Sequence, residues 1–118
     1  MNKKVIGNNG EKIVADYLTA NGYKIMAMNY KNKVGEIDII AVIDSILVFV
    51  EVKTRNYNSY GSPSEAVDRK KQSKIIKTSL LYLQMKNINE LQVRYDVAEV
   101  YPLENNRIVY IENAFNAW

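Results

Sequence analysis

The chain has 118 residues, of which 47% are hydrophobic and 25% charged, and its net charge at pH 7 is +3. This length and composition are typical of one globular domain spanning residues 1–118. Because the sequence contains neither cysteine nor histidine, it excludes disulfides, thiolate nucleophiles, zinc sites built on these residues, and imidazole-based triads. Any metal would have to bind through oxygen, which favours Mg²⁺, Mn²⁺ or Ca²⁺.

Targeting signals are not apparent in the sequence. No apolar run approaches the ~20 residues that a membrane span requires, and the first ten residues lack the apolar core of a signal peptide. We therefore expect a cytoplasmic protein with no membrane partner.

The first predicted element is an amphipathic helix over residues 10–21. Asn8 or Asn9 can cap its start, and Asn21-Gly22 supplies a left-handed stop. At helical spacing, Glu11 falls on the apolar face of this helix together with Val14, Ala15 and Leu18.

Apolar strands and a second helix follow. Strands are predicted over 23–30, 36–43, 46–54, 91–101 and 107–112. The second helix is predicted to start at a capping box over 62–65 and to end near residue 86, with an inner face of Ile76, Leu80 and Leu83. The order helix, three strands, helix, two strands predicts an α/β fold, with a central mixed sheet flanked by helices.

Three charged residues, Asp38, Glu51 and Lys53, lie in or at the edge of the apolar strands 36–43 and 46–54. If Asp44-Ser45 forms a two-residue turn, Asp38 stands directly opposite Glu51, and Glu36 opposite Lys53. Facing residues point to the same side of a sheet, with Cβ atoms ~5 Å apart. The hairpin thus predicts a pair of carboxylates on one face of the sheet.

Such a pair of carboxylates is costly. Two carboxylates ~5 Å apart repel by ~3 kcal/mol at an effective dielectric constant of ~20, whereas a whole domain is stable by only ~5–15 kcal/mol. A divalent cation bound between Asp38 and Glu51 would reverse this repulsion. The alternative is that both acids are exposed on an edge strand and form weak surface ion pairs, although strands that are apolar on both faces are usually central.

A basic segment, residues 69–77, carries five positive charges and no negative charge. Such a segment suits a polyanion such as nucleic acid, or else forms a solvated helix face. The candidate nucleic-acid-binding residues are Arg55, Arg69, Lys70, Lys71, Gln72 and Lys74.

Five sequence segments together resemble the YraN-type family of uncharacterised bacterial proteins. They are "GEIDIIA" (35–41), "VFVEVKTR" (48–55), "YGSPSEAV" (60–67), "VRYDVAEV" (93–100) and "NAF" (113–115). That family is assigned to the restriction-endonuclease-like fold of the PD-(D/E)xK nuclease superfamily, and it is similar to archaeal Holliday junction resolvases. Ile37 stands where the superfamily usually has a proline.

The resemblance implies a role for each matching residue. Asp38 and Glu51 would be the metal-binding acids, and Lys53 the lysine that positions or activates the attacking water. Glu11 would be the acid contributed by the first helix, and the backbone carbonyl of Val52 would complete the metal shell.

The predicted function is therefore a Mg²⁺- or Mn²⁺-dependent nuclease that hydrolyses DNA phosphodiester bonds, with branched or junction DNA implied by the resemblance. One alternative is a nucleic-acid-binding module without catalysis within a larger DNA-processing assembly. Another is a protein–protein adaptor with structural Ca²⁺. A homodimer would enlarge the limited surface that a domain of this size offers to branched DNA.

Overall fold

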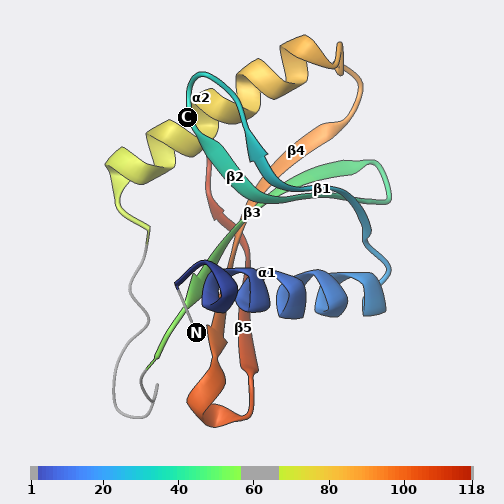
Figure 1. Cartoon of the computed structure of the whole chain (residues 1–118). Helices are drawn as coiled ribbons and strands as arrows, with labels where there is room; N and C mark the ends of the chain where they lie inside the picture. The colour runs from blue at the N-terminus through green and yellow to red at the C-terminus, as the bar shows by residue number, and fades with distance from the viewer. Residues whose placement is uncertain (1–2, 57–66, 118) are drawn as a thin grey trace.

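The computed structural model describes residues 3–56 and 67–117, with side chains described from residue 9 onward (Figure 1). Along the chain lie α1 (Lys3–Ala20), β1 (Lys24–Lys31), β2 (Glu36–Ile43), β3 (Ile46–Thr54), α2 (Arg69–Met85), β4 (Gln92–Tyr101), the short 3₁₀ helix η1 (Pro102–Glu104) and β5 (Arg107–Phe115).

The strands form one five-stranded sheet in the order β1-β2-β3-β4-β5. Only β3 and β4 run parallel, and the other neighbours are antiparallel. Helix α1 packs on one face of the sheet and α2 on the other (Figure 1). This order and layering confirm the predicted α/β, restriction-endonuclease-like fold. Among the described helices, none is both long enough and apolar enough to cross a membrane.

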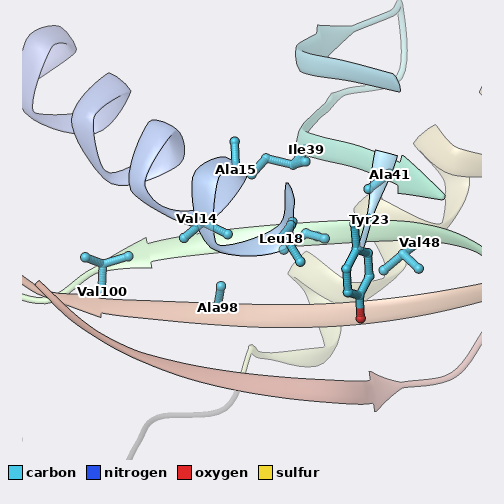
Figure 2. Packing of buried hydrophobic residues seen from close by; sticks show 10 residues of the cluster. Val14, Ala15, Leu18, Tyr23, Ile39, Ala41, Val48, Ala98 and Val100 are labelled. Atoms are coloured by element: carbon cyan, nitrogen blue, oxygen red, sulfur yellow. The ribbon is translucent and has the colours of Figure 1, made fainter. Parts of the chain in front are cut away.

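Helix α1 covers its face of the sheet with the apolar residues that the sequence predicts. Figure 2 shows Val14 and Leu18 packed over the strands, next to Ala98 of β4. The helix starts at Lys3 rather than at residue 10, so Asn8 and Asn9 lie within it and are not caps. The predicted stop is confirmed, because Gly22 has a φ of +89°.

Helix α2 differs from its prediction in its start and at one residue of its inner face, whereas Ile76 and Leu83 pack against the core as predicted. It begins at Arg69, where the Asp68 side chain caps it by accepting the Lys71 N–H at 2.8 Å; the predicted capping box at 62–65 lies outside the described residues. Leu80 is 45% exposed, so its predicted place on the inner face is wrong. The buried stripe is Ile75, Thr78, Ser79 and Tyr82.

Two hydroxyl groups explain this phase of α2. Thr78 donates to the Lys74 carbonyl oxygen at 2.7 Å, and the Ser79 hydroxyl lies 2.6 Å from the Tyr95 hydroxyl of β4. Because their hydrogen bonds are satisfied inside the protein, these polar residues can replace leucine against the sheet.

The β2–β3 hairpin has the predicted register. Its turn is Asp44-Ser45, and the ladder runs from Ile43 opposite Ile46 to Ile39 opposite Val50. The ladder ends there, so the predicted placement of Glu36 opposite Lys53 is wrong. On the other side of β2, Glu36 pairs with Lys31 of β1, with 3.8 Å between carboxylate and ammonium.

Strand β2 changes face at Asp38. Residues two apart in a regular strand point to the same side, yet Ile37 packs in the core on the α2 side and Ile39 in the core on the α1 side. On β1 the residue between the partners of Ile37 and Ile39 is Asn29, whose φ is +52°. This irregularity places Asp38 at the boundary between the two layers, where β2 and β3 separate.

Candidate active site

The candidate site is built where the β2–β3 ladder ends. There the Asp38 side chain, rather than the backbone of β2, bonds to β3: its Oδ2 accepts the Val52 backbone N–H at 2.8 Å. The carboxyl group of Glu51, whose side chain is 12% exposed, lies within hydrogen-bonding reach of the Asp38 carboxyl. The β2–β3 ladder ends before Asp38 and Glu51, so they are not the directly facing pair that the register predicts. Their side chains nevertheless interact beyond the last ladder pair.

The pair holds protons more strongly than ordinary carboxyl groups do. Burial, together with the charge of Asp38, raises the pKa of Glu51 to about 7. Burial also raises the pKa of Asp38, against the lowering effect of the Val52 N–H. Like charges in a poorly solvated site compete for ionisation, so a proton stays on the pair up to near-neutral pH.

Helix α1 brings a third acid to the same place. Burial and the charge of Asp38 raise the pKa of Glu11 to about 6, and the Asn29 side chain opposes this shift. Within the described part of the chain, Glu11 Oε2 is buried without a hydrogen-bond partner. Because an unpaired buried polar atom is costly, this oxygen is available to a ligand.

Helix α2 supplies a cation to the pair. Lys71 Nζ lies 3.5 Å from Glu51 Oε1 and lowers the pKa of Glu51. Both residues line a hollow of about 470 Å³ whose wall also includes Lys53, Arg55 and Asp68. We call it the acid hollow.

The residues present fit a magnesium-type ion. Mg²⁺ is usually held by one or two carboxylates and keeps several waters, which leaves room for substrate phosphate oxygens. Asp38 and Glu51 supply two repelling carboxylates, and Glu11 adds an unpartnered oxygen close by. Across residues 3–56 and 67–117, no group of three or more acidic side chains is arranged to hold a metal ion by itself.

Val52 and Lys53 lie next to the acids on β3. The recorded contact of Val52 with Asp38 uses its amide N–H, and its side chain packs against the α1-side core. Lys53 is half-buried, lines the acid hollow and lies opposite Glu99 in the β3–β4 ladder.

The predicted nucleic-acid-binding residues fall into two groups. Arg69, Lys70 and Lys74 are exposed on the first turns of α2. The other group is already engaged within the protein: Gln72 donates to the Val67 carbonyl at 2.7 Å, Lys71 pairs with Glu51, and Arg55 pairs with buried Glu99 at 3.0 Å.

Two further acids were not singled out from the sequence, although they lie inside the apolar strand β4. Asp96 and Glu99 are both fully buried. Asp96 accepts hydrogen bonds from Arg94, Tyr110 and the Asn113 N–H, and Glu99 accepts two from Arg55. An acid in an apolar strand thus indicates a buried acid. Whether that acid forms a structural ion pair or belongs to a candidate site is decided by the residues that it contacts.

Comparison with known proteins identifies the family. The family model described as "Uncharacterised protein family UPF0102" matches residues 10–100. A UPF0102 protein of Caldanaerobacter subterraneus subsp. tengcongensis is 48% identical to the chain, over 98% of each protein. Similar relatives in Clostridioides difficile and Alkaliphilus oremlandii are 47% and 48% identical over 98% of this chain and 100% of their own lengths. The YraN-type resemblance is thereby confirmed, and the chain belongs to the uncharacterised protein family UPF0102.

Proposed function

We propose that the protein is a Mg²⁺- or Mn²⁺-dependent nuclease that hydrolyses phosphodiester bonds in nucleic acid, with DNA as the expected substrate. The observation that carries the proposal is the contact between Asp38 and Glu51, two partly buried carboxyl groups of raised pKa beside a hollow lined with basic residues. Lys71 forms an ion pair with Glu51, one of these two acids, whereas Asp96 and Glu99 each have an arginine partner.

The chemistry divides between the acids and the basic residues. A divalent ion, when bound, lowers the pKa of its water and stabilises negative charge on phosphate. Asp38 and Glu51 must be ionised to hold it, and Lys71 favours that state of Glu51. Lys53 faces the same hollow, where its ammonium group can orient the phosphate or the attacking water.

The test is cleavage of end-labelled single-stranded, duplex, flap and four-way-junction DNA, and of matching RNA, with Mg²⁺, Mn²⁺ or EDTA. We expect cleavage that requires metal and falls by at least ~100-fold, equivalent to ~2.7 kcal/mol of barrier, in Asp38→Asn and Glu51→Gln. Asp16→Asn is the matched control, because Asp16 is an exposed acid whose recorded ion pair, to Lys12, is on the solvent side of α1. Cleavage that persists in EDTA, or at the wild-type rate in Asp38→Asn, would refute the proposal.

A second candidate is a nucleic-acid-binding module without catalysis. The Lys71–Glu51 ion pair favours it, because a lysine that neutralises one acid reduces the need for a metal. In that case wild type binds the same nucleic acids without cutting them, and Asp38→Asn binds equally well and is more stable.

A further inference from the structure

A second hollow adjoins the acid hollow. It has a volume of about 630 Å³ and lies between the β1–β2 turn and α2, which run side by side in Figure 1. Its wall includes Lys31, Lys70 and Lys74, and we call it the lysine hollow. Asp68 and Lys71 line both hollows, so the two join at the start of α2.

One wall of the lysine hollow is a hairpin turn fixed against α2. Asn32 closes the turn by accepting the backbone N–H of Val34 at 2.9 Å and by donating to the Thr78 carbonyl of α2 at 3.2 Å. Gly35 approaches α2 so closely that a Cβ there would lie 2.8 Å from Thr78 Oγ1 and 3.3 Å from the Lys74 side chain. These contacts fix the position of the turn relative to α2, so the two walls of the lysine hollow are part of the packed fold.

The charges of the lysine hollow suit a polyanion. Lys31, Lys70, Lys71 and Lys74 outnumber the acids Glu36 and Asp68 in its wall. The Lys31 ammonium is only 3.8 Å from Glu36 in an ion pair whose side chains are 73% and 58% exposed, and such exposed pairs are weak. Lys31 can therefore exchange its contact with Glu36 for a phosphate oxygen.

We propose that one nucleic-acid strand lies across both hollows, with phosphates on one side of the scissile bond held in the lysine hollow by Lys31 from the β1–β2 hairpin and Lys74 from α2. This inference rests on the proposed nuclease function and names the path of its substrate. Lys71 marks the junction, between the candidate metal-binding acids and the bound strand. The substrate must then extend beyond the scissile bond on that side.

The test is binding of a fluorescein-labelled 20-nucleotide DNA, single-stranded or duplex, measured by anisotropy in EDTA over a series of salt concentrations. Each lysine that contacts a phosphate contributes ~0.7 for single strands or ~0.9 for duplex to the slope of log K against log salt concentration. The Lys31→Gln/Lys74→Gln variant should lose about twice that value. Lys24→Gln/Lys77→Gln is the charge-matched control, because both are exposed lysines on β1 and α2 outside the hollow.

The outcomes separate this inference from the proposed function. A reduced slope in the test variant and a smaller reduction in the control support the path, and Lys31→Arg/Lys74→Arg should restore the wild-type slope. Equal slopes in the test variant and the control overturn the path, while metal-dependent cleavage that is lost in Asp38→Asn would leave the nuclease standing. Wild type that neither binds in EDTA nor cleaves with metal overturns both.

Discussion

The Asp38 and Glu51 carboxyl groups are maintained in contact although they repel each other. The fully buried acids of β4 have arginine partners, whereas Asp38 accepts a backbone N–H and interacts with the acids Glu51 and Glu11. Burial raises the pKa of both groups, and the charge of Asp38 adds to the rise at Glu51. A carboxylate that is destabilised in the free protein is a candidate for binding a cation, because the cation would stabilise its charged form.

Replacing Asp38 by Asn should lower the pKa of Glu51 from about 7 towards its ordinary value of 4.5, because the variant removes a negative charge that raises it. The measurement is a ¹³C NMR titration of glutamate carboxyl carbons in wild type and variant. Asp16→Asn should leave the titration of Glu51 unchanged. An unaltered pKa in Asp38→Asn would show that the two carboxyl groups do not interact.

The same pair makes a pH-dependent contribution to stability. Because the pKa of Glu51 rises from 4.5 to about 7 on folding, the folded chain binds more protons than the unfolded chain between those values. Stability from this source is therefore highest below pH about 4.5 and falls as pH rises towards 7. We expect urea denaturation to show that the free energy of unfolding of wild type falls relative to that of Asp38→Asn between pH 5 and pH 8. An equal difference between the two proteins at both pH values would contradict this expectation.

A buried ion pair fixes the end of β3. Removing the Arg55 cation by Arg55→Met leaves Glu99 charged in a fully buried position, and breaking one side of such a pair typically costs ~3–5 kcal/mol. Lys12→Met, which breaks an exposed pair with Asp16, should cost at most ~0.5 kcal/mol. Chemical denaturation of both variants measures the contrast, and similar losses would mean that Glu99 is not held by Arg55.

At the scale of elements, the β1–β2 turn and α2 act as one unit. Gly35→Ala introduces a Cβ against Thr78, whose hydroxyl is itself bonded to the Lys74 carbonyl, so the side chain cannot easily turn away. We expect a loss of ~1–3 kcal/mol from overpacking.

A double-mutant cycle tests the origin of this loss. Thr78→Ala removes the hydroxyl that the new Cβ meets, so the double variant Gly35→Ala/Thr78→Ala should be more stable than the sum of the single effects predicts. Additive losses, measured by urea denaturation, would mean that the turn does not rest on α2 at this point.

At the scale of the whole molecule, the element order and the β2–β3 register follow from the sequence, because local apolar patterns and a two-residue turn determine them. The face change at Asp38 does not follow from the sequence pattern. It depends on Asn29 with its positive φ on the neighbouring strand, and strand periodicity assumes regular alternation.

The candidate site likewise combines features that the sequence predicts with features that depend on tertiary packing. Asp38, Glu51 and Lys53 are visible as charges in apolar strands. The register brings the two acids to the same end of the hairpin ladder, although the ladder stops before they face each other. The place of Lys31 does not follow from the sequence, because only the packing of the β1–β2 turn on α2 brings it to the same hollow as Lys74. The inner-face position predicted for Leu80 is wrong for a related reason. Thr78 satisfies its hydroxyl within α2 and Ser79 bonds to Tyr95 of β4, so these polar residues can face the sheet.

We expect Asp38 and Glu51 to hold a divalent cation together. Mn²⁺ binding at pH 8, above the pKa of about 7 of Glu51, tests this directly and is measured by electron paramagnetic resonance of free Mn²⁺. We predict saturable binding to wild type and Asp16→Asn that Mg²⁺ displaces, with loss of binding in Asp38→Asn and in Glu51→Gln. Binding that is unchanged in either of these two variants, or absent from wild type, would contradict the account.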